Sequence, residues 1–324
     1  MTLVLSGFLL GYAGAWFVMR YGDRLGTIDI PGHRSSHHKE VPKGAGLGIL
    51  AALVFSSLML QIPVFIWMPA LVISLASFWG ADKYILPVSQ RLVIHFGCSL
   101  FFLFFFLSWK QVDALSYAAW LPVLFFIVGT ANFYNFMDGI DGIAGITGFI
   151  AFSMTAFYVR LLGLDQAFFY LGLCLAFSCL GFLCFNIPRA KVFLGDVGSI
   201  LLGFVFACLI VFLSQDLSDF MVMAAFLAPF YFDEIFTMVV RIKHRDSLIE
   251  PHRRHIYQLL VNEAGIGHWK VALGYGMVQL AIGVSVIAAQ PKGWGVLLGI
   301  YFLCGLMFVI FSIIIRRKFV ADEN

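Results

Sequence analysis

Four polar residues recur at steps of three between two long apolar runs: Asn132, Asn135, Asp138 and Asp141, within TANFYNFMDGIDGIAG. On a helix, residues three apart are neighbours with roughly 5–6 Å between their Cβ atoms. Two carboxylates this close repel by roughly 2–4 kcal/mol at an intermediate effective dielectric, so a positive partner is expected. Mg2+ is one candidate, because it takes oxygen ligands and commonly joins one or two carboxylates to substrate phosphates.

The same stretch predicts a break in the helix. Residues spaced three apart turn gradually around a helix axis, so the side chains of Asn132 and Asp141 would point in different directions. Gly139 and Gly142 favour a bend around a bound group. A helix cap with solvated acids is the alternative. A calcium loop is excluded, because no Glu closes a twelve-residue loop.

A second acidic stretch, NIPRAKVFLGDVGS, covers residues 186–199 and places Asp196 between Gly195 and Gly198 as the next helix begins. Helix N-termini and glycine turns offer backbone N–H groups to phosphate, and Lys191 adds a point charge. Phe193 has two interpretations, stacking on a base or facing lipid, and the residues alone favour lipid.

Two basic stretches complete the set of candidate sites. SLIEPHRRHIYQLL holds Arg253 and His255, and Arg is suited to bidentate phosphate contacts, although an anionic-lipid patch is an equal interpretation. DIPGHRSSHHKEVPKGAGLG holds Arg34 and Lys43 ahead of a glycine-rich helix start, and its alternative is a basic loop beside the membrane.

The composition predicts that these stretches are positioned by membrane-spanning helices. Of 324 residues, 61% are hydrophobic and 12% charged, and the mean hydropathy is +0.93, against about 45–50% apolar residues in soluble domains. A helix needs about 20 residues to cross the bilayer. We therefore predict an all-α, polytopic integral membrane protein, one domain over 1–324, with about eleven helices. The predicted spans are 2–20, 47–61, 64–80, 92–108, 117–132, 144–162, 167–186, 198–214, 219–240, 269–290 and 293–315.

The loops differ sharply in charge between the two sides. Of the 21 Lys and Arg residues, all but Lys110, Arg160 and Lys292 fall on one side. The positive-inside rule makes that side cytoplasmic, which places the C-terminus and the long loops inside. His95 is the one histidine within a predicted span, and we expect a hydrogen-bonded structural role for it.

Taken together, these stretches resemble the polyprenyl-phosphate N-acetylhexosamine-1-phosphate transferases, a membrane family of the glycosyltransferase family 4 type. NFYNFMDGIDGIAG and AKVFLGDVGS carry the resemblance most specifically, and it extends from Asp29 to about Gln258. DIPGHRSSH and PHRRHIYQ look most like the bacterial subgroup that starts O-antigen or capsule chains.

The resemblance implies transfer of a sugar-1-phosphate from a UDP-N-acetylamino sugar to undecaprenyl phosphate, with release of UMP. It implies Mg2+ as cofactor, with Mn2+ as a substitute, in a bacterial inner membrane with the active face in the cytoplasm. The expected partners are the two substrates and the lipid bilayer; a homodimer is the family-based expectation, and no nucleic acid is expected.

The resemblance also assigns residues where the motifs match. Asp196 corresponds to the metal-binding Asp, with Asp138 as a second metal contact, and Asp138 and Asp141 to the catalytic acids. The predicted substrate-binding residues are Asn135, Asn186, Lys191, Phe193, Arg253, His255, Arg34 and Lys43. Within this family Phe193 would stack on uracil, which reverses the lipid interpretation drawn from the residues alone.

One position departs from the family pattern. The family has an adjacent Asp pair, whereas this chain reads WGADKYIL, so Ala81 replaces the first Asp and Asp82 supplies the second, catalytic one. A phosphate monoester has a second pKa of about 6, so the lipid phosphate is largely ionised near neutrality. Losing one positioned group can still cost on the order of 10²–10⁴ in rate. We therefore hypothesise a natural variant that uses Asp82 alone or an engineered, slowed protein.

Two other functional classes fit parts of the sequence. A secondary transporter also has many spans and broken helices, but it predicts helix repeats and a site near the bilayer midplane. A catalytically inactive binding or assembly homologue is the second alternative. The sequence does not identify the sugar, since the discriminating contacts are expected in the 241–268 loop.

Overall fold

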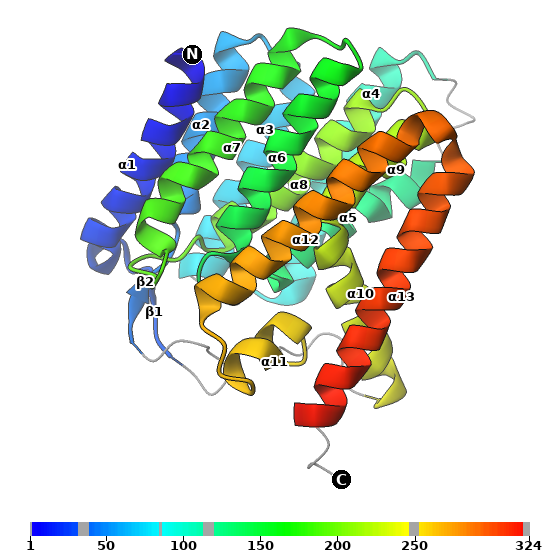
Figure 1. Cartoon of the computed structure of the whole chain (residues 1–324). Helices are drawn as coiled ribbons and strands as arrows, with labels where there is room; N and C mark the ends of the chain where they lie inside the picture. Colours follow the sequence, from blue (N-terminus) through cyan, green and yellow to red (C-terminus); the bar gives the residue numbers. More distant parts are fainter. Residues whose placement is uncertain (1, 32–38, 84–85, 113–119, 246–252, 320–324) are drawn as a thin grey trace.

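The computed structural model describes residues 2–31, 39–83, 86–112, 120–245 and 253–319, with the backbone alone for 81–83. Almost all of this chain is helical (Figure 1). The elements in chain order are α1 (Thr2–Leu25), β1 (Ile28–Asp29), β2 (Val41–Pro42), α2 (Gly46–Met59), α3 (Val64–Ser77), the π-helix η1 (Phe78–Lys83), α4 (Val88–Trp109), α5 (Leu121–Phe136), α6 (Ile143–Leu161), α7 (Gln166–Asn186), α8 (Asp196–Leu213), α9 (Leu217–Ala224), η3 (Ala225–Leu227), α10 (Ala228–Lys243), α11 (Ile256–Asn262), α12 (His268–Ala289), η4 (Gln290–Lys292) and α13 (Trp294–Phe319).

The predicted all-α, polytopic membrane fold is confirmed. In the described chain, eight helical segments are long and apolar enough to cross a membrane. Three shorter apolar helices, Gly46–Met59, Val64–Gly80 and Leu121–Phe136, account for the remaining predicted spans. The predicted span 219–240 corresponds to α9, η3 and α10 in succession. The exact number of crossings stays a prediction.

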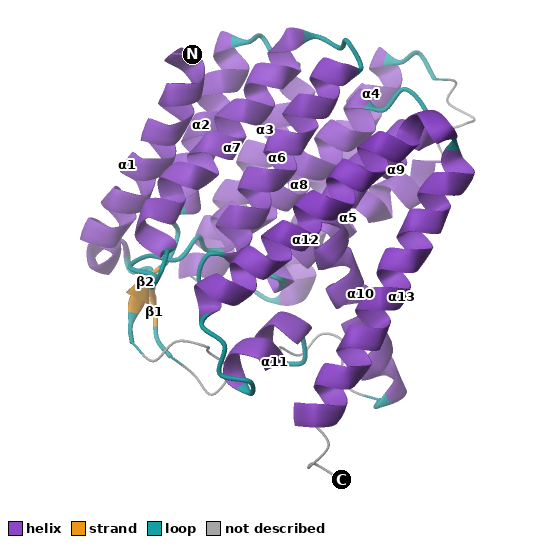
Figure 2. Cartoon of the chain, viewed as in Figure 1, coloured by secondary structure: helices purple, strands orange, loops and turns teal. Residues whose placement is uncertain are grey.

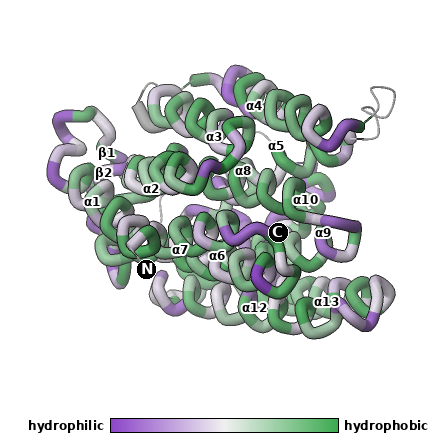
Figure 3. The backbone as a smooth tube through the Cα atoms, turned by 90° about the horizontal axis from the view of Figure 1, so that it is seen from above, coloured by the Kyte–Doolittle hydropathy of each residue, from purple (hydrophilic) through white to green (hydrophobic). Residues whose placement is uncertain are grey.

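Helix α8 forms the centre of the bundle. Its sequence after the first turn is apolar on every side, and all but two of its residues are buried, as expected of a helix that is surrounded by other helices. It packs against α5 and α3, and it is enclosed when the bundle is viewed along its axes (Figure 3). Because α8 begins at Asp196, the core helix presents this carboxylate at the end of the bundle.

Helix α1 packs through a stripe of small residues. Its buried positions include Gly7, Gly11 and Ala15, and a Cβ placed on Gly11 would overlap the backbone of Ser178 in α7. Small residues at a spacing of four let helix backbones approach closely inside a membrane. By contrast, α13 buries only Leu297 and Ser312 and exposes apolar side chains along its length, as a lipid-facing helix does.

Both strands and α11 lie at the same end of the bundle (Figure 2). β1 and β2 pair antiparallel, with Ile28 opposite Pro42 and Asp29 opposite Val41. The sequence analysis predicted neither this hairpin nor α11. We call this end of the molecule the loop face, and it carries every site described below.

Candidate active site

The acidic turn, residues 137–142, connects α5 to α6. Helix α5 ends at Phe136 and α6 begins at Ile143, so the predicted break is confirmed. Gly142 has a φ of +89°, which strongly favours glycine, and the Asp138 N–H donates to the Asn135 carbonyl at 3.2 Å. Asp138 and Asp141 are both partly buried in this turn.

Asn186, at the end of α7, joins the acidic turn to the segment 187–195. Its Oδ1 accepts the Gly142 N–H at 2.6 Å, and its Nδ2 donates to the Val192 carbonyl at 2.9 Å. The Ala190 N–H donates to Asp141 Oδ2 at 3.2 Å across the same gap. Asn186 is only 5% exposed, and these hydrogen bonds let it hold the two segments together; its predicted contact with substrate stays a prediction.

His268, at the start of α12, lies against Asp141. The Asp141 N–H donates to His268 Nδ1 at 3.2 Å, and the same nitrogen is 3.4 Å from Asp141 Oδ2. A backbone amide can only donate, so Nδ1 acts as the acceptor and any proton of a neutral ring is on Nε2. The imidazole therefore fixes the backbone of the acidic turn.

Asp196 meets side chains from two other helices. Its Oδ2 is 2.9 Å from Nη1 of Arg91 in α4, and each side chain is about a quarter exposed, at 25% and 23% respectively. Asn135 also hydrogen-bonds the Asp196 carboxylate, and the Ser199 hydroxyl donates to Asn135 Oδ1 at 2.6 Å. The two motifs that the sequence analysis singled out thus meet through Asn135 and Asp196.

Lys43 and Phe193 are brought together by backbone pairing. They form a parallel β-bridge, in which the Phe193 N–H donates to the Pro42 carbonyl at 2.8 Å and the Phe193 carbonyl accepts from Gly44 and Ala45. The positive charge of Lys43 acts on Asp196 together with that of Arg91. Lys191 is exposed beside them.

The close contact of two helix starts makes this pairing sterically possible. A Cβ on Gly46 would overlap the backbone of Gly198. Glycine at both positions therefore lets the start of α2 lie directly against the start of α8. This contact brings the Lys43 loop beside Asp196.

The oxygen donors fit a hard cation in a restricted way. Among the residues with described side chains, no group of three or more His, Cys, Asp or Glu is arranged to hold a metal ion. Asp196 contacts Arg91 instead, and Asp141 contacts His268. Mg2+ is commonly bound through one or two carboxylates with substrate phosphates and water. The donors therefore fit a cation bound jointly with a diphosphate, and they do not fit one held by protein ligands alone.

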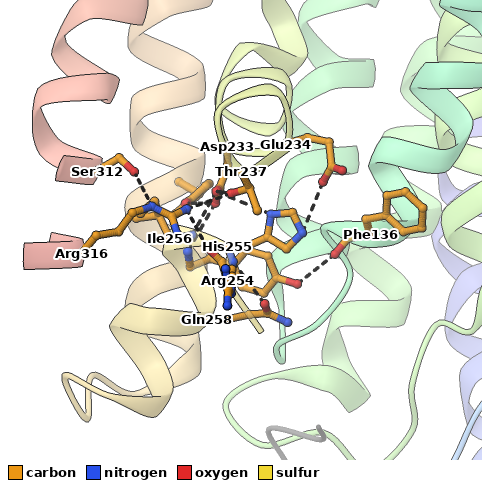
Figure 4. Close-up of polar contacts among 12 residues, drawn as sticks. Phe136, Asp233, Glu234, Thr237, Arg254, His255, Ile256, Gln258, Ser312 and Arg316 are labelled. Atoms are coloured by element: carbon orange, nitrogen blue, oxygen red, sulfur yellow. Dashed lines mark hydrogen bonds and ion pairs between the residues drawn. The ribbon is translucent and has the colours of Figure 1, made fainter. Parts of the chain in front are cut away.

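The basic segment, residues 253–258, contacts α10 through the side chain of His255 and the backbone of Ile256 and Tyr257. His255 is 2% exposed, with Nδ1 at 3.6 Å from Asp233 Oδ1 and Nε2 at 3.3 Å from Glu234 Oε2 (Figure 4). The ring thus faces the protein interior, whereas Arg253 is partly exposed. The predicted substrate-binding roles of Arg253 and His255 stay predictions.

Two predicted residues lie outside what the structure describes. Arg34 lies between residues 31 and 39, outside the described ranges, and of Asp82 only the backbone, in η1, is described. The expectation for His95 is confirmed, since it is 2% exposed with Nδ1 3.1 Å from the amide nitrogen of Asn132.

Sequence reasoning missed several residues of the loop face. Asp233 and Glu234 carried a usable signal, because two adjacent acids inside an apolar run mark a functional or paired site by default. Arg91 and His268 carried none that separated them from the other basic residues of the same side.

Residues 63–214, which include both acidic motifs, match the family model described as glycosyl transferase family 4. The chain is similar to this family over these residues, which make up just under half of its length. A Bacillus subtilis (strain 168) relative, a probable undecaprenyl-phosphate N-acetylglucosaminyl 1-phosphate transferase, is 27% identical over 94% of this chain and 86% of that protein.

Two further relatives match about 41% and 53% of the chain. An undecaprenyl-phosphate alpha-N-acetylglucosaminyl 1-phosphate transferase of Thermotoga maritima is 33% identical over 41% of this chain and 44% of its own length. A phospho-N-acetylmuramoyl-pentapeptide-transferase of Staphylococcus saprophyticus is 32% identical over 53% of this chain and 54% of its own length. With these two relatives the aligned region spans about half of each protein.

Proposed function

We propose that this protein transfers an N-acetylamino-sugar-1-phosphate from a UDP-sugar to undecaprenyl phosphate and releases UMP. An oxygen of the lipid phosphate attacks the β-phosphorus of the UDP-sugar. A new oxygen–phosphorus bond forms, and the bond from the β-phosphorus to the bridging oxygen breaks. UMP departs with that oxygen, and the lipid product keeps a diphosphate linkage to the sugar.

One observation carries the proposal: carboxylates and cations from four separate chain regions meet at the loop face. Asp196 lies beside Arg91 and receives the charge of Lys43, and the acidic turn is tied to the 187–195 segment by Asn186. Phosphoryl transfer depends almost entirely on positioning and on charge neutralisation. The names of two relatives include undecaprenyl phosphate and an N-acetylglucosaminyl 1-phosphate group, and the UDP-sugar donor is part of the proposal.

The residues of the candidate site have different proposed roles. Arg91 and Lys43 attract and orient the phosphates, with Arg suited to a bidentate contact. Phe193 stacks on the uracil ring, and Arg253 binds the diphosphate or the sugar. Asp138 and Asp141 orient the donor's sugar and diphosphate at the acidic turn.

Mg2+, with Mn2+ as a substitute, is the proposed cofactor, and Asp196 with Asp138 would hold it. When it is bound together with the diphosphate, it neutralises negative charge on the phosphates. Arg91, which contacts Asp196 in the structure, would bind a phosphate oxygen of the donor in its place.

The cellular setting is part of the proposal. The loop face lies in the cytoplasm beneath the bacterial inner membrane, the lipid product begins an O-antigen or capsule chain, and the protein forms a homodimer. The charge asymmetry of the loops supports the orientation. A soluble donor and a lipid acceptor can meet at such a boundary.

Purified protein in lipid nanodiscs, given undecaprenyl phosphate, Mg2+ and a panel of UDP-N-acetylamino sugars, provides the test. We expect UMP and lipid-linked sugar from at least one donor, and a fall on the order of 10²-fold with Asp196→Asn. A chelator should abolish turnover. No UMP from any donor, or full activity of Asp196→Asn, would contradict the proposal and favour a transporter or an inactive homologue.

The same assay decides what Ala81 means. If the chain is slowed by loss of the first Asp of the pair, Ala81→Asp should raise turnover on the order of 10²-fold. If the chain is a natural variant that uses Asp82 alone, turnover should stay within about twofold of the parent. Asp82→Asn serves as the control, and it should abolish turnover in either case.

A further inference from the structure

A buried carboxylate in α10 holds the start of α11. Asp233 has no exposed surface, and it accepts the Ile256 N–H at 2.9 Å, the Tyr257 N–H at 3.4 Å and the Tyr275 hydroxyl at 2.6 Å. Gln258 completes the arrangement, because its Oε1 accepts the His255 N–H at 3.3 Å. Side-chain acceptors at a helix start satisfy N–H groups that have no partner within the helix.

Helix α13 contacts the basic segment at Arg254, the residue before His255. Arg316 Nη2 donates to the Arg254 carbonyl at 2.6 Å and to Thr237 Oγ1 at 3.0 Å (Figure 4). The Thr237 hydroxyl in turn donates to Asp233 Oδ1 at 3.2 Å. The basic segment is thus fixed by α10, α12 and α13 together, through backbone groups that no substitution of Arg253 would remove.

Tyr257 extends this anchor to the acidic turn. Its hydroxyl donates at 2.9 Å to the carbonyl of Phe136, the last residue of α5, where helix carbonyls lack intrahelical partners. A Cβ on Gly139 would overlap the same hydroxyl, so the two groups are in direct contact. Burial raises the pKa of Tyr257 well above its usual value, with the nearby carboxylates of Asp233 and Asp138 adding to the effect. The phenol therefore stays protonated and keeps donating.

We propose that Asp233 and Tyr257 are positioning residues that hold the basic segment and the acidic turn in one fixed arrangement. Asp233 fixes the position of residues 253–258. Tyr257 belongs to this segment and contacts the acidic turn, so it fixes the position of Asp138 relative to the segment. Neither residue touches substrate. The proposal rests on the proposed function, because it makes Arg253 and Asp138 act on the same bound UDP-sugar.

A matched pair of tyrosines tests the second contact. Tyr257→Phe removes only the hydroxyl that reaches Phe136, and Tyr301→Phe removes one that donates to the Met221 carbonyl at 2.6 Å, away from the loop face. We expect kcat to fall about tenfold with Tyr257→Phe, the KM for undecaprenyl phosphate to stay constant, and Tyr301→Phe to leave both unchanged. Equal kcat for the two variants would overturn the role of Tyr257.

A matched pair of buried aspartates tests the first contact. Asp233 and Asp219 each accept a tyrosine hydroxyl and at least one backbone N–H, and Asp219 does so with Tyr158 and Gln215. Asp233→Asn and Asp219→Asn therefore remove a similar charge from similar surroundings. We expect a loss of kcat of tenfold or more only for Asp233→Asn, after correction for the folded fraction. Equal losses would show a purely structural role for Asp233.

Amide hydrogen exchange separates this inference from the proposed function. Tyr257→Phe should speed exchange of the amides in residues 137–142 several-fold relative to the parent, and Tyr301→Phe should not. If the parent shows no turnover but this difference is present, the proposed function fails and the positioning contact stands. If exchange in 137–142 is the same in both variants, the contact does not position the turn and the inference fails.

Discussion

Asp196 meets a guanidinium at the place where the proposed reaction requires a phosphate and a cation. The pair with Arg91 is about a quarter exposed on each side, and ion pairs with this much solvent contribute only about 0–1 kcal/mol to folding. Little free energy is therefore lost when Arg91 changes partner. Arg91 is always charged and loses little free energy when it leaves Asp196, so it is suited to bind a substrate phosphate.

Replacement of Arg91 tests this role at the level of a single side chain. Arg91→Gln should raise the KM for the UDP-sugar about tenfold to a hundredfold, since hydrogen bonds to charged groups contribute about 1.5–3 kcal/mol. The thermal midpoint should change little. Steady-state UMP release measures the effect, with Arg160→Gln, at an exposed arginine in the last turn of α6, as control. An unchanged KM in Arg91→Gln would rule out a phosphate contact.

The contact between α2 and α8 determines whether Lys43 and Asp196 share a site. Backbone lies against backbone at Gly46 and Gly198, and the hydrogen bonds of Phe193 to Pro42, Gly44 and Ala45 depend on it. Packed interiors relax only partly around an added group. A single methyl group at this crossing therefore acts on two helices and on the site between them.

Gly46→Ala should lower stability by about 1–3 kcal/mol through overpacking and reduce turnover at the same time. Gly97→Ala in α4 is the matched control, because a Cβ there meets nothing within 4 Å, and alanine is the better helix former. Thermal unfolding in detergent should therefore show the first variant melting lower and the second at or above the parent. Similar midpoints for both would contradict the tight crossing.

The sequence predicted the long elements well and the short ones not at all. Apolar runs such as 198–214 specify a helix by themselves, because backbone groups inside a membrane must be hydrogen-bonded internally. The seven-residue α11 is too short to be stable alone, and Asp233 of α10, 23 residues before Ile256, holds its start. Contacts of this kind depend on tertiary structure, which residue spacing does not encode.

The same distinction applies to the candidate site. Asn135, Asp138, Asp141 and Asp196 stood out because acids and amides beside glycines are unusual in an apolar chain. Arg91 is one of many basic residues in the sequence, and only the packing of α4 against its neighbours brings it to Asp196. The roles of the predicted residues on substrate stay predictions.

At the scale of the whole molecule, the described residues of the candidate site lie at one end of the bundle. The hairpin, the acidic turn, the 187–195 segment and α11 all belong to the loop face. The few basic residues of the opposite loops, such as Lys110 and Lys292, are exposed. The bundle is thus strongly asymmetric along its axis, and this asymmetry is the basis for the proposed orientation.

Single cysteines introduced into a cysteine-free variant measure that orientation. Lys292→Cys should react with a membrane-impermeant maleimide in intact cells, because its loop is expected outside. Lys191→Cys should react only after the membrane is permeabilised. Both positions are exposed in the structure, so burial cannot explain a difference. Labelling in the reverse order would place the loop face outside the cell and exclude a cytoplasmic donor.

Helices α2 and α5 are short for membrane-spanning helices, and this affects the depth of the candidate site in the bilayer. At 1.5 Å per residue, their 14 and 16 residues span only about 21 and 24 Å, against a hydrocarbon thickness of about 30 Å. Either the bilayer thins around them or their polar ends sit several ångströms beneath the headgroups. Lys43 lies just before the start of α2, and Asn135 lies in the last turn of α5. In either case, the polar groups of the candidate site lie below the headgroup level of an undistorted bilayer. The phosphate of a polyprenyl phosphate can then reach the site while its polyprenyl chain stays in the hydrocarbon core of the bilayer.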